Sequence, residues 1–263
     1  MALRWHGILT LELADEMKTL ADTVTLRWKG HAWLSPGIAV FYGRSGHQDW
    51  HHHQAHQIAL GIESSVTVET PEGSEVGDAV FVPAGVQHRL SGNTIISVYL
   101  DVLSDEARAL PDTKLGQIEV DTADVRVFTE ALNSTGEIDL ELRFGVRRIL
   151  RLTDPPLADS RLSLVSAALR GGLMGRDELA ALVHLSPTRF SHWFVEQTGL
   201  PLRSYAKWLR LTHAIQLLAG GWQMTNAAHE AGFSDSAHFS RTFRALLGID
   251  PSSALAEVRL RND

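Results

Sequence analysis

The sequence predicts an α+β fold with a β-rich N-terminal half, linker helices and an all-α C-terminal half. Three observations carry this prediction. The length of 263 residues is typical of two domains. Short β-type runs fill the chain to about residue 103, and apolar residues then recur at helical spacing. The turn Asp154-Pro155-Pro156 separates the two expected domains, residues 1–153 and residues 157–263.

The β-type runs alternate apolar and polar residues or are short and wholly apolar. They lie at residues 23–28, 66–69, 79–82 and 95–100. Turn residues bound them, notably Pro71-Glu72-Gly73 and Gly77-Asp78. Short strands with frequent turns are typical of a sandwich or a small barrel.

Two amphipathic helices are expected next, within residues 122–152. Val125, Phe128 and Leu132 follow i, i+3, i+7 spacing, and residues 142–150 repeat a similar pattern. We expect these linker helices to follow the β-rich part directly.

The C-terminal half reads as a series of short helices. They are expected at about 159–170, 176–184, 187–198, 202–219, 224–231, 235–247 and 252–258. Ser186-Pro187 and Asp235-Ser236 are typical helix starts. Gly199 and Gly248 are typical of the position just after a helix.

Residues 189–199 and 238–248 repeat one pattern at an offset of 49 residues. Both runs read basic-Phe-Ser-basic-x-Phe-x4-Gly. The two Phe residues of each run lie at i, i+4, which predicts a helix with one buried face and one polar face. A short polar helix after a tight turn suits the major groove of DNA, and two copies suggest two neighbouring grooves.

Net charge differs between the two halves. From residue 160 on, 11 basic residues exceed 8 acidic ones, whereas 13 basic and 23 acidic residues precede it. This asymmetry indicates two domains with different partners. The chain has no cysteine, which excludes disulfides, thiolate metal sites and a cysteine nucleophile. No signal-peptide pattern and no membrane-length apolar run is present, so we expect a cytoplasmic protein with no membrane partner.

Residues 176–259 resemble the DNA-binding domain of the AraC/XylS family of transcription regulators. The resemblance rests on residues 228–244, which read AHEAGFSDSAHFSRTFR, followed by Gly248 and Pro251. Residues 179–218 agree with the earlier half of that domain. Ala237 departs from the family, which often has a polar residue there, and this limits what the second helix reads.

The resemblance implies sequence-specific binding to double-stranded operator DNA. The residues expected at the DNA are Thr188, Arg189, Ser191, His192, Ser236, Ala237, His238, Arg241 and Arg244. Arg241 is the expected base contact, with a surface salt bridge to Glu230 or Asp235 as the alternative. Phosphate contacts are expected from Arg189, Arg203, Lys207 and Arg244, with a solvated surface position as the alternative for each. Trp193, Trp208 and Trp222 are expected to pack between helices.

The N-terminal half is rich in histidine, with eight of the 13 before residue 100. The segment His51-His52-His53-Gln54-Ala55-His56-Gln57 and the later Gly77-x5-Pro83-x-Gly85-x2-His88 resemble the two cupin motifs. This resemblance implies a cupin-like β-barrel ahead of the AraC-type domain. His51, His53, Gln57 and His88 are the expected effector site, while His52 and His56 are expected at the surface.

A divalent transition metal at His51, His53 and His88 is one reading of this cluster. Three neutral imidazoles and an amide oxygen suit zinc, nickel, copper or iron. Gln57, however, stands where the cupin motif has an acidic residue, which removes a negative charge. We therefore expect an organic effector rather than a metal.

The whole pattern predicts a transcription regulator, not an enzyme. Its expected partners are operator DNA, a small-molecule or metal effector, a second copy of the chain through the helices at 122–152, and RNA polymerase if the chain activates transcription. The alternative is a metal-dependent cupin oxygenase or isomerase with a helical C-terminal domain. That alternative explains the histidines but not the repeated 49-residue unit.

Overall fold

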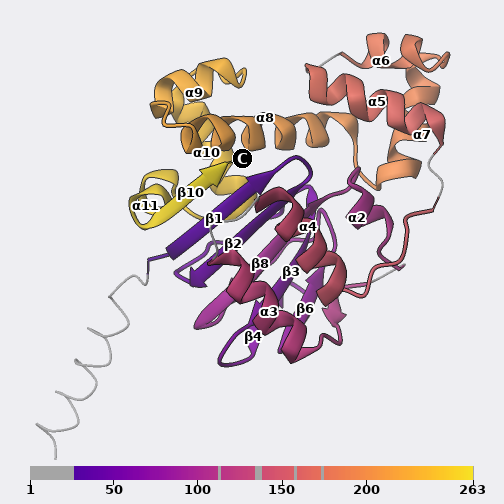
Figure 1. The fold of residues 1–263 in the computed structure, drawn as a ribbon. Helices are drawn as coiled ribbons and strands as arrows, with labels where there is room; N and C mark the ends of the chain where they lie inside the picture. Colours follow the sequence, from indigo (N-terminus) through magenta and orange to yellow (C-terminus); the bar gives the residue numbers. More distant parts are fainter. Residues whose placement is uncertain (1–26, 112–113, 134–137, 157–158, 173–174, 263) are drawn as a thin grey trace, which may run out of the picture.

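The fold was analysed in a computed structural model that describes residues 27–111, 114–133, 138–156, 159–172 and 175–262. A sheet domain lies below a helical domain in Figure 1, and the chain first passes from one to the other between α4 and α5. The C-terminal strand then returns from the helical domain to the edge of the sheet.

In the described part of the chain, seven strands form the larger sheet and three form a smaller one. The larger sheet has the order β10 (Val258–Asn262), β1 (Lys29–Ser35), β2 (Ile38–Arg44), β8 (Thr94–Asp101), β3 (Ala55–Gly61), β6 (Ala79–Val82) and β9 (Gly116–Gln117). The smaller sheet has the order β5 (Gly73–Gly77), β4 (Val66–Thr70) and β7 (Arg89–Ser91). The pair β1–β10 is parallel, and the other pairs are antiparallel.

The larger sheet is buried on both faces, as its apolar runs predict. Alternate residues of β3 and β6 point to opposite faces. Ile58 and Phe81 join a cluster under the linker helices, whereas Ala59 and Val80 join the cluster beneath the small sheet. Gln57 therefore points to the barrel interior with Ala59.

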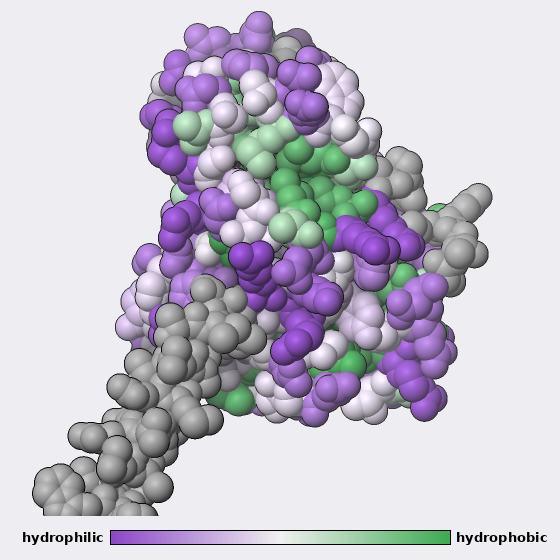
Figure 2. Space-filling model, turned by 90° about the vertical axis from the view of Figure 1, so that its left-hand side faces the viewer, coloured by the Kyte–Doolittle hydropathy of each residue, from purple (hydrophilic) through white to green (hydrophobic). Residues whose placement is uncertain are grey.

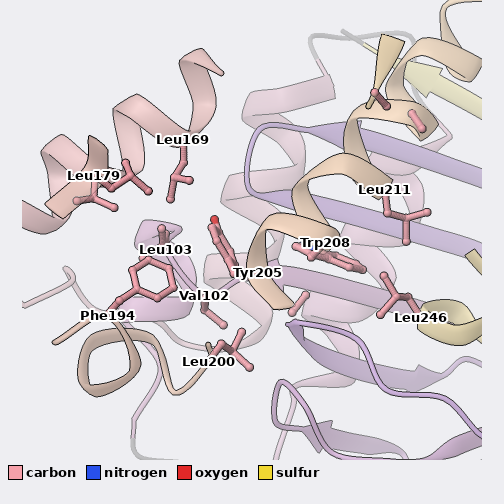
Figure 3. Packing of buried hydrophobic residues seen from close by; sticks show 14 of the residues in the cluster. Val102, Leu103, Leu169, Leu179, Phe194, Leu200, Tyr205, Trp208, Leu211 and Leu246 are labelled. Carbon is pink, nitrogen blue, oxygen red and sulfur yellow. The ribbon is translucent and has the colours of Figure 1, made fainter. Parts of the chain in front are cut away.

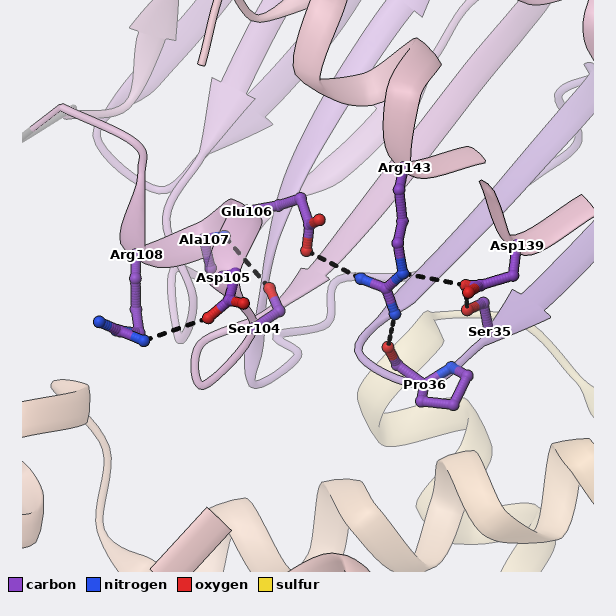
Figure 4. A network of polar contacts seen from close by, with 9 residues as sticks. All are labelled: Ser35, Pro36, Ser104, Asp105, Glu106, Ala107, Arg108, Asp139 and Arg143. Carbon is purple, nitrogen blue, oxygen red and sulfur yellow. Dashed lines mark hydrogen bonds and ion pairs between the residues drawn. The ribbon is translucent and has the colours of Figure 1, made fainter. Parts of the chain in front are cut away.

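The linker helices α3 (Thr122–Leu132) and α4 (Ile138–Ile149) cover the outer face of the larger sheet (Figure 1). Before them comes the short helix α2 (Asp105–Arg108). Arg143 of α4 joins three segments: it donates to Glu106 of α2 at 3.0 Å, to Asp139 at 3.0 Å and to the Pro36 carbonyl at 2.6 Å (Figure 4). Because Glu106 is buried, this network fixes the linker helices firmly on the sheet.

The helical domain follows the expected order closely. Its helices are α5 (Ser160–Gly171), α6 (Arg176–Leu182), α7 (Pro187–Thr198), α8 (Leu202–Ala219), α9 (Met224–Glu230), α10 (Ser236–Leu247) and α11 (Pro251–Glu257). The caps are those predicted: Ser186 and Asp235 accept from backbone amides at the starts of α7 and α10, and Gly199 and Gly248 end them in the left-handed conformation.

One strand prediction is not tested, and one strand was not predicted. The strand expected at 23–28 lies mostly outside the described residues, and β1 begins only at Lys29. The strand β10 was not predicted at all. It pairs with β1, more than 220 residues away in sequence, and such non-local pairing leaves no local signal.

The two domains share one hydrophobic cluster. Val102 and Leu103, which follow β8, lie among Leu169, Phe194 and Tyr205 of the helical domain (Figure 3). The Tyr205 hydroxyl also donates to Asp101 at 2.8 Å. The helical domain is therefore packed on the sheet domain rather than tethered to it. None of the described helices is long and apolar enough to cross a bilayer.

Candidate functional site

His51, His53 and His88 converge inside the sheet domain, as the two cupin motifs predict. His51 and His88 exchange backbone hydrogen bonds of 2.9 and 3.0 Å, which brings the two motifs side by side. The imidazole ring centres of His51 and His88 lie 4.3 Å apart, and those of His53 and His88 lie 5.0 Å apart. All three side chains are buried, with at most 1% of each exposed.

Backbone carbonyls orient all three rings in the same way. The Nδ1 atom of His51 lies 3.1 Å from the Asp49 carbonyl, that of His53 2.8 Å from the Ala55 carbonyl, and that of His88 2.9 Å from the Val86 carbonyl. A carbonyl only accepts, so each neutral ring carries its proton on Nδ1. Each Nε2 atom therefore presents a lone pair.

Gln57 lies between two of these lone pairs. Its Oε1 atom is 3.1 Å from His53 Nε2 and 2.9 Å from His88 Nε2, and its Nε2 atom faces the Ser97 and Tyr99 hydroxyls. Three acceptors facing one another repel. Either the amide is turned, so that its NH₂ donates to both rings, or a cation lies among the acceptors. Both arrangements satisfy every polar group.

Burial keeps the cluster neutral. Desolvation lowers the pKa of His51 to about 2 and that of His53 to about 3, with the other histidines as the next cause. It lowers the pKa of His88 as well. Neutral imidazole is the form that binds metal, and one ligand atom from each histidine lies within 4.8 Å of the others. The donor set and its tautomers fit a divalent transition ion held by three imidazole nitrogens, with Gln57 Oε1 as the fourth ligand.

The helical domain covers this cluster. The Trp208 ring of α8 lies 6.0 Å from the His53 ring, and Gly248, at the end of α10, contacts the segment that carries His51. Trp208 is buried between the domains, so its predicted packing role is confirmed, although its position over a histidine was not foreseen.

The first repeated helix, α7, presents most of its expected DNA residues to solvent. Thr188, Arg189 and His192 are exposed, and Ser191 is partly buried. The Ser191 hydroxyl donates to the Pro187 carbonyl at 3.0 Å, which leaves it less available to a base than the other three.

The second helix, α10, is partly engaged within the protein. Ala237 and Arg241 are exposed, whereas Ser236 and His238 are partly buried. The His238 ring packs on Phe233 and lies 3.2 Å from the Ser234 hydroxyl. Ser234 and Phe233 thus position His238, which the pattern alone could not show.

Arg241 and Arg244 differ in their partners. Among the described residues Arg241 forms no ion pair with Glu230 or Asp235, so the structure does not contain its predicted alternative role. Its charge still helps to lower the pKa of Asp235, after the hydrogen bonds from the His238 amide and Ser234. Arg244, an expected phosphate contact, instead forms an ion pair with Asp49 of the sheet domain at 2.6 Å.

Two side chains lie elsewhere than expected. His56 is partly buried and accepts from the Ala84 amide at 3.2 Å, and burial lowers its pKa to about 4. The expectation of a surface position is confirmed for His52 and wrong for His56. Trp222, expected between helices, is 47% exposed.

Sequence reasoning did not find a cavity of about 950 Å³ between the domains. Tyr99, Asp101 and Leu103 line it from the sheet domain, and Leu169 and Trp208 line it from the helical domain. Burial raises the pKa of Asp101 and that of Tyr205, which share a hydrogen bond at its wall. The docking of two distant segments creates this cavity, so no local motif marks it.

The depressed histidine pKa values predict a loss of stability in acid. The unfolded chain binds protons on these histidines near pH 6.5 and the folded chain does not, so the free energy of unfolding falls as pH drops from about 6.5 toward 3. Each histidine adds a slope of up to about 1.4 kcal/mol per pH unit. Urea unfolding at pH 7.5, 6 and 5 measures it. His53→Gln should reduce the slope, and His52→Gln should not. Equal slopes in all three proteins would contradict the burial argument.

Comparisons with known proteins agree with this geometry. A family model described as a helix-turn-helix domain matches residues 179–257. The activator RhaR of Pectobacterium carotovorum is 33% identical over 105 residues, which is 38% of this chain and 37% of that protein. The arabinose operon regulatory protein of Escherichia coli is 30% identical over 124 residues, 47% of this chain and 38% of that protein. The chain thus matches less than two fifths of the length of these curated relatives.

Solved structures resemble the whole fold. ToxT from Vibrio cholerae superposes with a TM-score of 0.59 at 13% identity, covering 84% of this chain and 98% of that one. ToxT with a bound unsaturated fatty acid gives a TM-score of 0.58 at 14% identity, covering 88% and 98%. At such identity the likeness concerns the fold. Together with the family model, it shows a helix-turn-helix domain at residues 179–257 behind an N-terminal sheet domain.

Proposed function

We propose that the chain is a sequence-specific DNA-binding transcription regulator whose sheet domain senses an effector at the histidine cluster. The observation that carries this proposal is the repeated helix. Both α7 and α10 begin at a side-chain cap and bury two phenylalanines. Each also exposes a basic residue near its centre, His192 in α7 and Arg241 in α10. Two such helices held by α8 suit successive major grooves.

The enzyme alternative has less support. The relatives with similar helical domains are named as regulators. The cluster of His51, His53 and His88 is covered by the helical domain, whereas a cupin oxygenase or isomerase needs a path for its substrate.

We infer that the occupant of the histidine cluster is a single divalent transition ion. The expectation against metal rested on the missing carboxylate at Gln57. The geometry favours an ion because the Nε2 lone pairs of His53 and His88 face Gln57 Oε1, the Nδ1 protons are anchored, and an organic molecule has no access to side chains at most 1% exposed. Such an ion would add positive charge and hold His51 and His88 together. An organic effector is better suited to the 950 Å³ cavity.

Elemental analysis of protein purified without a histidine tag or chelator tests this inference. We expect near-stoichiometric zinc, nickel, copper or iron, lost in His53→Ala and retained in His52→Ala, whose side chain is exposed. Metal-free wild-type protein that is stabilised by a small organic molecule would contradict the ion and restore the organic effector.

The linker helices offer a surface for a homodimer. Leu140 and Phe144 lie at i, i+4 on the face of α4 turned away from the sheet and are 49% and 69% exposed, and Val127 of α3 is 41% exposed. Exposed apolar side chains grouped on two packed helices are typical of an interface with a second copy.

Phe144→Asp should therefore shift the protein from dimer to monomer in light scattering at micromolar concentration, because it places a charge in the interface. Leu164→Asp is the matched control, since Leu164 is 50% exposed on a helix of the other domain. A monomeric wild-type protein, or dimers in both variants, would show that the linker helices do not form a dimer interface.

DNA binding tests the main proposal. Wild-type protein should protect two patches about 10 base pairs apart per protomer on its own upstream DNA. Arg241→Ala should weaken specific binding by about 1–3 kcal/mol, because a bidentate guanine contact is lost, and weaken binding to unrelated DNA much less. Arg126→Ala, an exposed arginine of the sheet domain, is the control. Equal losses of binding free energy on specific and unrelated DNA would indicate that Arg241 contacts a phosphate rather than a base.

A further inference from the structure

A short loop of the sheet domain, residues 47–51, holds the end of α10 directly. The Asp49 amide donates to the Gly248 carbonyl at 2.7 Å, and the Gln48 side-chain amide donates to the Leu247 carbonyl at 2.9 Å. These carbonyls belong to the last turn of α10, which has no helical partners for them. We call residues 47–51 the docking loop.

The fit between the docking loop and α10 leaves no space for one more carbon atom. A Cβ atom built on Gly248 would lie 2.5 Å from the Asp49 carbonyl oxygen, 2.7 Å from Gln48 Cγ and 2.8 Å from His51 Nδ1. Gly199 ends α7 with nearly the same left-handed φ, +70° against +71°, yet a Cβ atom there meets nothing within 4 Å. The repeat thus contains two equivalent glycines of which only one is packed against the sheet domain.

The docking loop also belongs to the histidine cluster. It ends at His51, whose Nδ1 atom faces the Asp49 carbonyl, and Gln48 lies 3.5 Å from His51 Nε2. Gln48 additionally accepts from the Leu90 amide at 2.9 Å. Any change in the position of His51 therefore moves the groups that hold α10.

Asp49 engages a residue that DNA would also use. Arg244 makes two contacts with one Asp49 oxygen, at 2.7 Å from Nε and 2.6 Å from Nη2. The arginine side chain stays 62% exposed, so a DNA phosphate could reach it. A phosphate and the Asp49 carboxylate cannot both occupy this position, because they carry like charges.

Figure 2 shows the face of the molecule that carries α9, α10 and α11 in the helical domain above the sheet domain. Hydrophilic residues border the junction of the two domains there. The contact between Asp49 and Arg244 is accessible to water, since 39% of the Asp49 side chain and 62% of the Arg244 side chain are exposed, whereas Gly248 is buried.

We propose that the docking loop is an autoinhibitory contact: it holds α10 against the histidine cluster and gives Arg244 the Asp49 carboxylate in place of a DNA phosphate. This proposal rests on the proposed DNA-binding function. DNA binding by the second helix then requires Arg244 to leave Asp49, and opening of the docking loop exposes His51 at the same time.

Hydrogen–deuterium exchange of the full chain tests the docking itself. Gly248→Ala should increase exchange in residues 46–51, because the new Cβ separates the Asp49 amide from the Gly248 carbonyl. Gly199→Ala places an alanine in the same left-handed conformation, but its Cβ atom meets no other residue. This variant should therefore leave residues 46–51 protected. Equal exchange in the two variants would overturn the docking contact.

Salt-dependent binding to unrelated duplex DNA tests the competition. Asp49→Asn should tighten binding several-fold at low salt and steepen the plot of log affinity against log salt by up to about 0.9, the value for one added phosphate contact. Glu69→Gln removes the same charge from a pair with Arg89 on the sheet domain and should change neither quantity as much. In an Arg244→Gln background, Asp49→Asn should have no effect.

The outcomes separate the two proposals. Tightening by Glu69→Gln equal to that by Asp49→Asn would mean general charge repulsion and would overturn the competition. If neither wild type nor any variant binds DNA, the proposed function fails. The exchange comparison of Gly248→Ala with Gly199→Ala still decides whether the docking loop holds α10.

Discussion

The packing of Val102 and Leu103 into the helical domain is the constraint on which the rest of this structure depends. These two residues follow the end of β8, the central strand of the larger sheet, and enter a core built by α5, α7 and α8. Burying two such side chains contributes about 3–6 kcal/mol in total, more than a surface ion pair can. The apolar contact therefore sets the position of the helical domain, and the polar contacts of Tyr205 and Arg244 adjust it.

That position determines the chemistry of the histidine cluster. With Trp208 over His53 and Gly248 against the loop of His51, the three imidazoles lose contact with water, and desolvation is the largest cause of their lowered pKa values. The helical domain therefore adds to the burial that keeps the histidines neutral. A cluster exposed at the mouth of an isolated barrel would titrate closer to the ordinary histidine range.

Local signals in the sequence predicted most of the fold. The starts of α7 and α10 and their glycine ends follow from backbone groups that need caps within a few residues, and the structure confirms them. The convergence of His51, His53 and His88 also followed from the resemblance of their two segments to the cupin motifs. The strand β10, the cavity and the pair of Asp49 with Arg244 did not, because each joins segments separated by a hundred residues or more. His238 illustrates the same limit on a smaller scale, since only the fold shows its ring against Phe233.

The two domains are coupled because one short loop takes part both in the histidine cluster and in the contact with α10. His51 and Asp49 are two residues apart, one in the candidate effector site and the other on a candidate DNA-contacting arginine. A ligand that binds the docked and undocked positions of this loop with different affinities shifts the equilibrium between them. The ratio of the two affinities sets the upper limit of that shift. By linkage, DNA that takes Arg244 from Asp49 must change the affinity of the histidine cluster by the same factor. Because the ion pair is largely exposed and weak, the tight fit of Gly248 has to carry most of this coupling.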